Sequence, residues 1–380
     1  MKGPECEKKK EEGNPPGNTP LTNEVLLVHL PIPPPPPWLS RMRARFPGVE
    51  VRWREAEVLP NSSLTTLDEL PDADLEGVTM ACLYPEPADA GRTMRDVRFV
   101  QLASAGSDRW AGHPVFGDRR VRFCSASGVH APQIGEWIIG TWLSFQHNLT
   151  QYALNQREQL WSPRTTDFGT DSVGQRMGIL GYGAIGRHAA RLARALGMEI
   201  YVHGRSPRPT PESRRLDPGG FSVQGTGDPE GELPSAWFSG AGGLDELLAS
   251  DLDLLVVCVP LTKDTRHLLS RREFAILEQR RRGRGGKGTF VCNVARGAVV
   301  DTDALVKALA SGQIAGAALD VTDPEPLPRG HPLWEAPNLF LSPHVAYQST
   351  SVFPRVAEVL FGNLERLEAG EPLVNEIFRG

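Results

Sequence analysis

The sequence predicts an α/β protein of about two domains, each built on a parallel sheet. Its 380 residues exceed the usual size of one domain. Short apolar runs alternate with stretches of helical periodicity, which indicates strands separated by helices. One such run, Asp253–Val259, is almost continuously apolar and is closed by Pro260. Because parallel sheets are covered on both faces, this pattern is typical of a central parallel strand.

A glycine-rich turn, which follows the short apolar run Met177–Leu180, organises the larger domain. Gly181, Gly183 and Gly186 have the spacing G-x-G-x-x-G, and a predicted helix, Arg187–Leu196, and a second strand come after them. In this context the glycines allow a tight turn, close approach of a pyrophosphate and close packing of helix on strand. The helix N-terminus offers N–H groups to phosphates. We therefore expect a dinucleotide site; the alternative is a turn that serves packing alone.

Composition and charge argue against several classes of protein. A hydrophobic content of 40% with 23% charged residues is typical of a globular protein. A net charge of -5 and a pI near 6.0 argue against a nucleic-acid or membrane-surface partner. The five cysteines form no CxxC pair, no signal peptide is visible, and the longest apolar helical stretch, 134–145, is too short to span a bilayer. We expect a cytoplasmic protein without a metal site.

The first third of the chain is predicted to form a small α/β domain behind a disordered tail. The tail, residues 1–23, is rich in charge, Gly and Pro. The polyproline stretch Pro31–Pro37 is expected to be a stiff loop, with an SH3-type ligand as the alternative. One short helix and five strands are expected at Trp38–Phe46 and at Glu24–Leu30, Val49–Trp53, Val78–Leu83, Arg98–Leu102 and Val121–Cys124.

Five further segments lie outside this pattern of strands. Ala103–Ser107 follows a strand and consists of small residues, so its N–H groups could hold a carboxylate. The helix Ala131–Phe145 is apolar on most faces, which predicts burial between domains or subunits. Gln151–Asp171 is a polar connector, for which Trp161 is the expected anchor. The Pro- and Gly-rich insertion 209–243 is expected to be mostly surface loop, and the basic run 280–284 a solvated loop.

Three polar side chains each follow an apolar strand near the end of the larger domain. They are Arg296, Glu325 and His344. In an open parallel sheet, ligands bind outside the carboxyl ends of the strands, and the glycine turn lies at that same edge. Taken singly, these residues could be a surface arginine, an exposed acid and a capping histidine. Their recurrence after consecutive strands predicts a catalytic set.

The same strand ends carry a family resemblance. Their sequences are Asn293-Val-Ala-Arg-Gly-Ala-Val-Val-Asp301, Ala318-Leu-Asp-Val-Thr-Asp-Pro-Glu-Pro326 and Ser342-Pro-His-Val-Ala346. They resemble the three signature blocks of the D-2-hydroxyacid dehydrogenases, and Val259–Thr262 with Thr265 and His267 matches the block between them. The resemblance covers about residues 98–375 and is nearest to the fungal glyoxylate/hydroxypyruvate reductase-type members.

This resemblance implies a Rossmann cofactor domain inserted into a flavodoxin-like substrate domain. Residues 24–125 and 347–380 would form the substrate domain, and residues 126–346 the NAD(P)-binding domain. The apolar helix from Ala131 would lie between the domains and in the interface of a homodimer. Ala105 and Gly106 fall on the loop that holds the substrate carboxylate in the family.

The resemblance also implies a reaction, in which hydride passes from NAD(P)H to a small 2-oxo acid and gives the D-2-hydroxy acid. The substrate would be of the glyoxylate or hydroxypyruvate kind. Arg296 would hold its carboxylate and carbonyl oxygen, and His344 would donate a proton to the developing alkoxide. Glu325 would bond the other ring nitrogen and favour the charged imidazolium; formate-oxidising relatives have an amide in its place.

The end of the second strand predicts which cofactor is used. An NAD enzyme of this fold carries Asp or Glu there, for the ribose 2′-hydroxyl. Here Arg205 and Ser206 stand instead, with Arg208 nearby, and they suit a 2′-phosphate. NADPH is therefore expected, and use of both NADPH and NADH is the alternative. The other expected cofactor-binding residues are Gly181, Gly183, Ala184, Ile185, Gly186, Val259, Pro260, Thr265, Val294 and Asp320, the last bonding the nicotinamide carboxamide.

A second class of function shares this fold. Dinucleotide-gated transcriptional corepressors bind peptides and turn over little substrate, and they keep the same Arg, Glu and His. The net negative charge of this chain and its lack of a nuclear-type basic cluster argue against that class. Consumption of reduced dinucleotide with a 2-oxo acid distinguishes the two.

Overall fold

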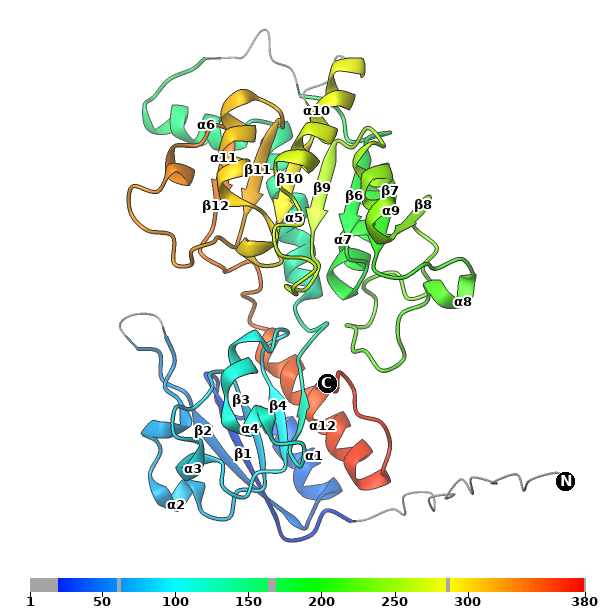
Figure 1. Cartoon of the computed structure of the whole chain (residues 1–380). Helices are drawn as coiled ribbons and strands as arrows, with labels where there is room; N and C mark the ends of the chain where they lie inside the picture. The colour runs from blue at the N-terminus through cyan, green and yellow to red at the C-terminus, as the bar shows by residue number, and fades with distance from the viewer. Residues whose placement is uncertain (1–19, 60–62, 163–168, 285–287, 379–380) are drawn as a thin grey trace, which may run out of the picture. The chain divides into compact units, whose positions relative to one another are not determined.

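The structure, a computed structural model, divides the chain into two compact units (Figure 1). One comprises the residues up to Ala126 and from Phe353 onward, and the other is Ser127–Val352. The structure describes residues 20–59, 63–162, 169–284 and 288–378. Within these ranges, residues 279–284 are described by their backbone alone. The sequence places the two boundaries after residues 125 and 346. The expected disordered tail lies, up to residue 19, outside the described residues.

The first unit holds a five-stranded parallel sheet in the order β2-β1-β3-β4-β5, coloured blue to cyan in Figure 1. This is the strand order of flavodoxin-like domains. Its strands are β1 (Glu24–Leu30), β2 (Val49–Glu55), β3 (Met80–Leu83), β4 (Phe99–Leu102) and β5 (Arg122–Cys124). Its helices are α1 (Pro36–Arg45), η1 (Leu67–Glu69), α2 (Asp72–Leu75), α3 (Ala90–Thr93), η2 (Asp108–Gly112), α4 (Pro114–Gly117) and α12 (Val352–Ala369).

Both ends of the chain contribute to this unit. The buried indole of Trp38 in α1 donates a hydrogen bond to the carbonyl oxygen of Ala357 in α12, at 2.8 Å. Arg122 of β5 pairs with Glu376, near the C-terminus, at 2.7 Å. The stretch Pro31–Pro37 connects β1 to α1 and supplies the first two residues of that helix. It is thus the stiff connection that the sequence favours.

The second unit holds a seven-stranded parallel sheet in the order β12-β11-β10-β9-β6-β7-β8. This is the doubly wound Rossmann order with one further strand at an edge, so the predicted fold class is confirmed. The strands are β6 (Arg176–Leu180), β7 (Glu199–Gly204), β8 (Ala236–Ser239), β9 (Leu254–Val257), β10 (Phe290–Asn293), β11 (Gly316–Leu319) and β12 (Leu339–Leu341). The helices are α5 (Ala131–Gln146), α6 (Leu149–Arg157), α7 (Ala184–Ala195), α8 (Pro211–Arg214), α9 (Gly240–Leu248), α10 (Arg271–Arg284), η3 (Gly297–Val299), α11 (Thr302–Ser311) and η4 (Pro332–Glu335).

The order in which successive strands are added to this sheet reverses between β6 and β9. Leu180 pairs with Val257 across these strands, and from there β7 and β8 extend the sheet on one side and β10 to β12 on the other. The loops that leave β6 and β9 must diverge, which creates a crevice at the carboxyl ends of the strands. The glycine turn begins directly after β6 and therefore lies in that crevice.

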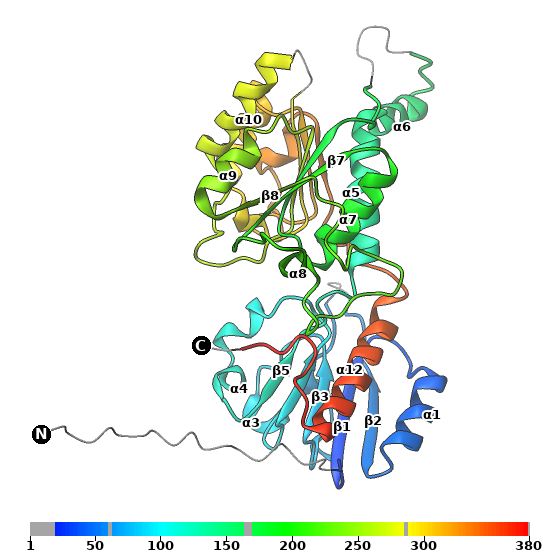
Figure 2. The same cartoon turned by 90° about the vertical axis from the view of Figure 1, so that its right-hand side faces the viewer.

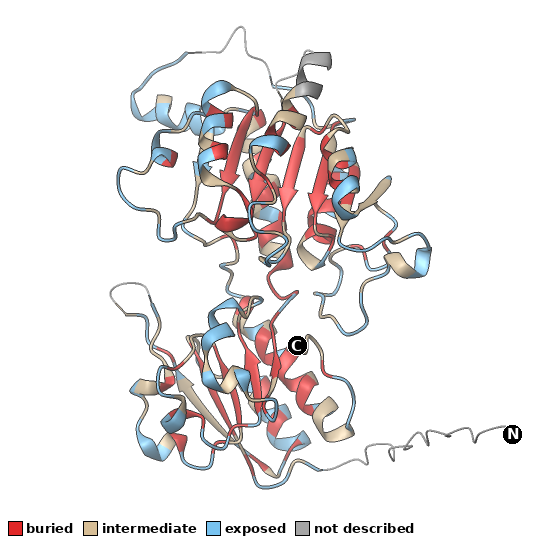
Figure 3. Cartoon of the chain, viewed as in Figure 1, coloured by how far each residue is buried: buried red, intermediate tan, exposed pale blue. Residues whose placement is uncertain are grey.

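Helix α5 is buried on one face only. Ile134, Ile138 and Trp142 belong to the core that includes β6 and β9, whereas Trp137 and Phe145 are half-buried. In Figure 3 the central strands of both sheets are coloured as buried. The sequence predicts that α5 is buried between domains or subunits; within the second unit alone its other face stays partly exposed. Within the described ranges, every helix is too short or too polar to traverse a lipid bilayer.

The insertion 209–243 is mostly surface loop, as the sequence predicts, but it also contains α8, the edge strand β8 and the start of α9 (Figure 2). Its Trp237 pairs with Val202 of β7. Two other expectations are wrong. The basic run 280–284 is helical, since α10 continues to Arg284. Trp161 is 97% exposed and so does not anchor the connector to any described residue, and α6 occupies the start of the predicted connector.

Candidate active site

The glycine turn after β6 combines two crowded positions with one open position. Gly181 has a φ of +95°, a conformation that residues with side chains rarely adopt. A Cβ at Gly186 would lie 2.4 Å from the carbonyl oxygen of Gly181, so a side chain there would push α7 away from β6. At Gly183 a Cβ would meet nothing within 4 Å. Two glycines therefore serve the turn and its packing, and Gly183 leaves space for a ligand.

The N-terminus of α7 fits the phosphates of a dinucleotide. Gly183 is the N-cap residue, and no side chain caps the helix. The first helical backbone bond runs from the N–H of Arg187 to the oxygen of Gly183, so the N–H groups of Ala184, Ile185 and Gly186 lack intrahelical acceptors. These donors and the positive end of the helix dipole form a site for an anion.

The end of β7 offers one unpaired cation. Arg205 and Ser206 are exposed, and Arg205 makes no hydrogen bond or ion pair within the described part of the chain. Arg208 is engaged elsewhere, because its Nη1 donates to the carbonyl oxygen of Ser213 at 2.7 Å. Of the arginines expected at a 2′-phosphate, Arg205 is thus the one with a free guanidinium.

The end of β9 forms the other wall of the crevice. The thiol of Cys258 donates to the carbonyl oxygen of Gly181 at 2.9 Å, and burial raises the pKa of this thiol to about 12, so it stays neutral. Val259 and Pro260 follow it, and Thr265 closes the loop by donating to the carbonyl oxygen of Pro260 at 2.7 Å. This wall is uncharged where it faces the glycine turn.

The turn that carries Arg296 is fixed from both sides. Asn293, the last residue of β10, accepts from the N–H of Ala295 at 3.0 Å and donates to the oxygen of Arg296 at 3.1 Å. A Cβ at Gly297 would lie 1.9 Å from the carbonyl carbon of Thr322, so only glycine lets this turn lie against the segment after β11. The half-buried Arg296 side chain therefore starts from a well-defined backbone position.

Asp320, at the end of β11, holds the loop after β12. Its carboxylate is 3% exposed and accepts three hydrogen bonds: from the hydroxyl of Ser342 at 2.6 Å, from the N–H of Val345 at 2.8 Å and from that of Ala346 at 2.9 Å. Its carbonyl oxygen accepts from the N–H of His344 at 2.7 Å. The loop carrying the histidine is thereby tied to the neighbouring strand.

His344 and Glu325 form a hydrogen-bonded pair. Nδ1 of His344 lies 2.7 Å from Oε1 of Glu325, which leaves Nε2 for another partner. This bond holds the pKa of the Glu325 carboxyl below its usual range against a smaller opposing effect of burial, and the charge of Arg296 adds to the lowering. The carboxylate is therefore ionised at neutral pH.

The candidate carboxylate loop lies in the first unit and is described by itself. The hydroxyl of Ser104 donates to the carbonyl oxygen of Gly106 at 2.7 Å, which closes a tight loop. The N–H groups of Ala105 and Gly106 have no acceptor among the described residues. Two free amides are consistent with an anion site, and their role stays a prediction.

The structure brings the sequence-predicted residues of the second unit to one sheet edge. Val294 also lies there, and its N–H donates to Val257 of β9 at 3.1 Å. Sequence reasoning missed three supporting residues: Asn293, Gly297 and Ser342. A polar residue that ends an apolar strand was the available signal for Asn293; the other two stand inside the signature blocks.

Comparison with known families places this chain. Residues 139–224 and 231–346 match the model of the D-isomer specific 2-hydroxyacid dehydrogenase, NAD-binding domain. A glyoxylate reductase of Thermofilum pendens is 29% identical over 89% of this chain and 90% of its own length. A glycerate dehydrogenase of Methylorubrum extorquens is 27% identical over 78% of this chain and 85% of its own length.

Solved structures agree with the family model. A D-isomer specific 2-hydroxyacid dehydrogenase from Xanthobacter autotrophicus, in complex with NADPH and MES, has a TM-score of 0.67 and 27% identity, covering 93% of this chain and 98% of that one. A family member from Aeromonas salmonicida shares the fold, with a TM-score of 0.70 and 23% identity over 94% of this chain and 99% of that one. The resemblance at the strand ends is thus confirmed, and this chain belongs to the D-isomer specific 2-hydroxyacid dehydrogenase family.

Proposed function

We propose that this chain reduces a small 2-oxo acid, of the glyoxylate or hydroxypyruvate kind, to the D-2-hydroxy acid and takes the hydride from NADPH in preference to NADH. The observation that carries the proposal is the Glu325–His344 pair, bonded at 2.7 Å on the sheet edge that also bears Arg296 and the glycine turn. The names of the glyoxylate reductase and glycerate dehydrogenase relatives support this substrate class.

The pair suits the proton transfer that this reaction needs. The bound nicotinamide would supply a hydride to C2 of the acid, and the carbonyl oxygen would gain negative charge as its π bond breaks. Nδ1 of His344 is committed to Glu325, so Nε2 would deliver the proton to that oxygen and leave a neutral imidazole. The ionised Glu325 favours the charged imidazole before the transfer and orients its ring.

Arg296 would position the substrate. Its guanidinium can hold the carboxylate and the carbonyl oxygen of a 2-oxo acid in one plane, which aligns C2 with the hydride donor. The well-fixed turn between Asn293 and Gly297 supports this role, because an arginine on a flexible backbone segment would not keep the substrate in one orientation.

The proposed preference for NADPH rests on Arg205. Its guanidinium has no partner within the described residues, and no carboxylate stands at the end of β7 to repel a 2′-phosphate. A relative solved with NADPH bound supports the proposal.

We expect the purified protein to oxidise NADPH when it is given glyoxylate or hydroxypyruvate, with pyruvate and bulkier 2-oxo acids tested beside them. Absorbance of the reduced nicotinamide measures the rate. His344→Ala should lower kcat about 10²–10⁴-fold, the usual worth of a general acid, and leave the dissociation constant of the dinucleotide nearly unchanged. Dinucleotide binding without turnover of any acid in this panel would contradict the proposal and favour the corepressor-like class.

We expect Glu325→Gln to change the pH profile of reduction in a defined direction. The lowered pKa of Glu325 keeps its carboxylate charged until the pH falls below the usual carboxyl range, so the acid limb of the wild-type pH–rate profile lies at low pH. Glutamine does not titrate, so the profile of the variant lacks this acid limb. Because the imidazolium also loses its negative partner, the alkaline limb of kcat/KM should move to lower pH. An unchanged alkaline limb would show that Glu325 does not stabilise the proton donor.

We expect Gly204→Asp combined with Arg205→Ala to move the preference from NADPH toward NADH. A Cβ at Gly204 would lie 3.9 Å from the carbonyl oxygen of Ser206, an ordinary contact, so the position accepts a Cβ without a clash. The measurement is kcat/KM for each reduced dinucleotide at a fixed concentration of 2-oxo acid. Arg194→Ala, which removes one charge at the far end of α7, is the matched control and should leave the ratio unchanged. A wild-type ratio that favours NADH would refute the assignment of Arg205.

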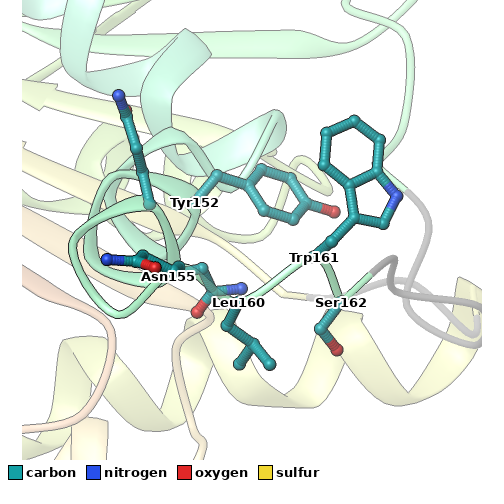
Figure 4. Close-up of a pocket in the computed structure, with 7 residues that line it drawn as sticks. Tyr152, Asn155, Leu160, Trp161 and Ser162 are labelled. Atoms are coloured by element: carbon teal, nitrogen blue, oxygen red, sulfur yellow. The ribbon is translucent and has the colours of Figure 1, made fainter.

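We further propose that the protein is a homodimer through an apolar patch on the second unit. Seven of the exposed large hydrophobic side chains lie close in sequence to α6 or to the edge strand β12: Leu149, Tyr152, Leu154, Leu160, Trp161, Trp334 and Phe340. A groove of about 460 Å³ is lined by both Leu154 and Phe340 and joins the two groups. Beside it, Tyr152, Leu160 and Trp161 line a second pocket of about 660 Å³ (Figure 4).

A second copy of this chain suits this patch better than a polar partner does. Exposed apolar side chains that gather in one patch often mark a protein–protein interface, and one patch used by both copies satisfies two-fold symmetry. Wild-type protein should sediment at twice its subunit mass of 41.5 kDa. Trp161→Ser with Leu160→Ser should shift it toward a single subunit, whereas Phe378→Ser, which changes an exposed aromatic outside the patch, should not. A monomeric wild type would contradict this interface.

A further inference from the structure

The segment between β7 and β8, residues 209–235, is fastened to the dinucleotide-binding turn. We call it the brace. None of the proposed catalytic or cofactor-binding residues lies in it, yet it makes buried polar contacts with Tyr182 and Arg187, which lie within and directly after the glycine motif. Loops usually run over the surface and tolerate change, so buried polar contacts at this place require an explanation.

Asp228 is the centre of these contacts. It is 7% exposed, and its carboxylate accepts three hydrogen bonds: from the hydroxyl of Tyr182 at 2.6 Å and from the N–H groups of Glu232 and Leu233, each at 3.1 Å. Two of these donors belong to the brace, and the third belongs to the residue between Gly181 and Gly183. A buried carboxylate with good partners on both sides joins the two segments firmly.

Arg187, the residue after the last glycine of the motif, makes the second connection. It is 2% exposed, and its guanidinium donates to the carbonyl oxygens of Asp228 and, at 2.6 Å, Arg214. The same guanidinium lies over the ring of Tyr182, 4.8 Å from its centre. Burial lowers the pKa of Arg187, so this buried charge depends on the carbonyl groups that the brace provides.

The brace has another contact, at the start of the second unit. Gly128 has a φ of +94°, and a Cβ there would lie 2.0 Å from the carbonyl oxygen of Phe221. A small cavity of about 10 Å³ is lined by Ala131 of α5, by Ala184 of α7 and by the brace residues Thr226 and Gly227. The brace therefore packs against both the segment that precedes α5 and the first turn of α7.

We infer that Asp228 is a positioning residue for the dinucleotide: through Tyr182 and Arg187 it holds the glycine turn in its binding conformation before the dinucleotide arrives. Gly181 and Gly183 give the turn its shape but also more conformational freedom than other residues would. Tyr182 is the side chain between them, so fixing its hydroxyl restrains both. A turn that is ordered beforehand loses less entropy on binding, which tightens the complex.

This inference concerns phosphates that NADPH and NADH share, so it does not rest on the preference proposed for Arg205. Weakening the Tyr182–Asp228 bond should raise the dissociation constants of both dinucleotides by a similar factor. The bond involves a charged acceptor, and its loss should cost about tenfold or more in affinity. Turnover with all substrates saturating should change less than about twofold, because none of these residues touches the reacting atoms.

The test compares Tyr182→Phe, Asp228→Asn and the double variant. Two variants are the matched controls. Asp217→Asn changes an exposed acid of the brace whose carboxylate accepts a hydrogen bond from the N–H of Gly219 at 2.9 Å, and Tyr201→Phe changes a tyrosine on β7. Calorimetric titration of the dinucleotide-free protein gives the dissociation constants of NADPH and NADH, and melting temperature reports stability. Limited proteolysis within residues 209–235 reports whether the brace has been released.

We expect both single variants, but neither control, to weaken binding of both dinucleotides. The dissociation constants of the double variant should not exceed those of the single variant that binds less tightly, because both changes remove the same hydrogen bond. Asp228→Asn should also speed cleavage within the brace. Unchanged dissociation constants combined with a lower melting temperature would overturn the inference and leave Asp228 a purely structural residue. Should Asp228→Asn fail to fold, Tyr182→Phe, which removes one hydroxyl, carries the same test.

Discussion

The hydrogen bonds of the buried Asp320 carboxylate determine where the candidate proton donor lies. A buried charge is tolerated only with good partners, and all three donors to this carboxylate come from the loop Ser342–Ala346. His344 has a φ of +55°, which is uncommon for a residue with a side chain. Its N–H bonds to the carbonyl oxygen of Asp320, so this conformation is compensated. A carboxylate has about four acceptor positions, which leaves Asp320 one for the nicotinamide carboxamide that we expect it to bind.

A close backbone contact fixes the loop that carries Arg296, as the Asp320 carboxylate fixes the loop that carries His344. Gly297 lies so close to Thr322 that a Cβ would sit 1.9 Å from its carbonyl carbon. The loop after β10 is therefore placed by the loop after β11, and β11 in turn holds the loop after β12. Three neighbouring strands thus fix one another's loops, which explains how the half-buried Arg296 and the exposed Glu325 can keep defined positions without being buried.

The sequence predicts the residues of this edge well because parallel strands end side by side. Arg296, Glu325 and His344 needed only a reading of apolar runs and the residues after them. Asp228 could not be predicted in this way, since it bonds to a tyrosine 46 positions earlier and stands in a segment without periodicity. The basic run was assigned to a loop by its charge, although arginine favours helices. For Trp161, an aromatic residue in a polar connector is equally compatible with an anchor and with exposure.

The strand order separates the residues that we expect to bind the anion from those that we expect to transfer the proton. Arg205 follows β7 and the glycine turn follows β6, whereas Glu325 and His344 follow β11 and β12. Neighbouring strands lie about 4.8 Å apart, so the four steps from β6 to β12 amount to about 19 Å, beyond the Debye length of about 8 Å at physiological ionic strength. The uncharged end of β9 lies between the two regions. Glu325, which lies 2.7 Å from His344, is therefore the charge that we expect to act on it, and we expect a change of cofactor preference at β7 to leave the proposed acid–base chemistry at β12 unaltered.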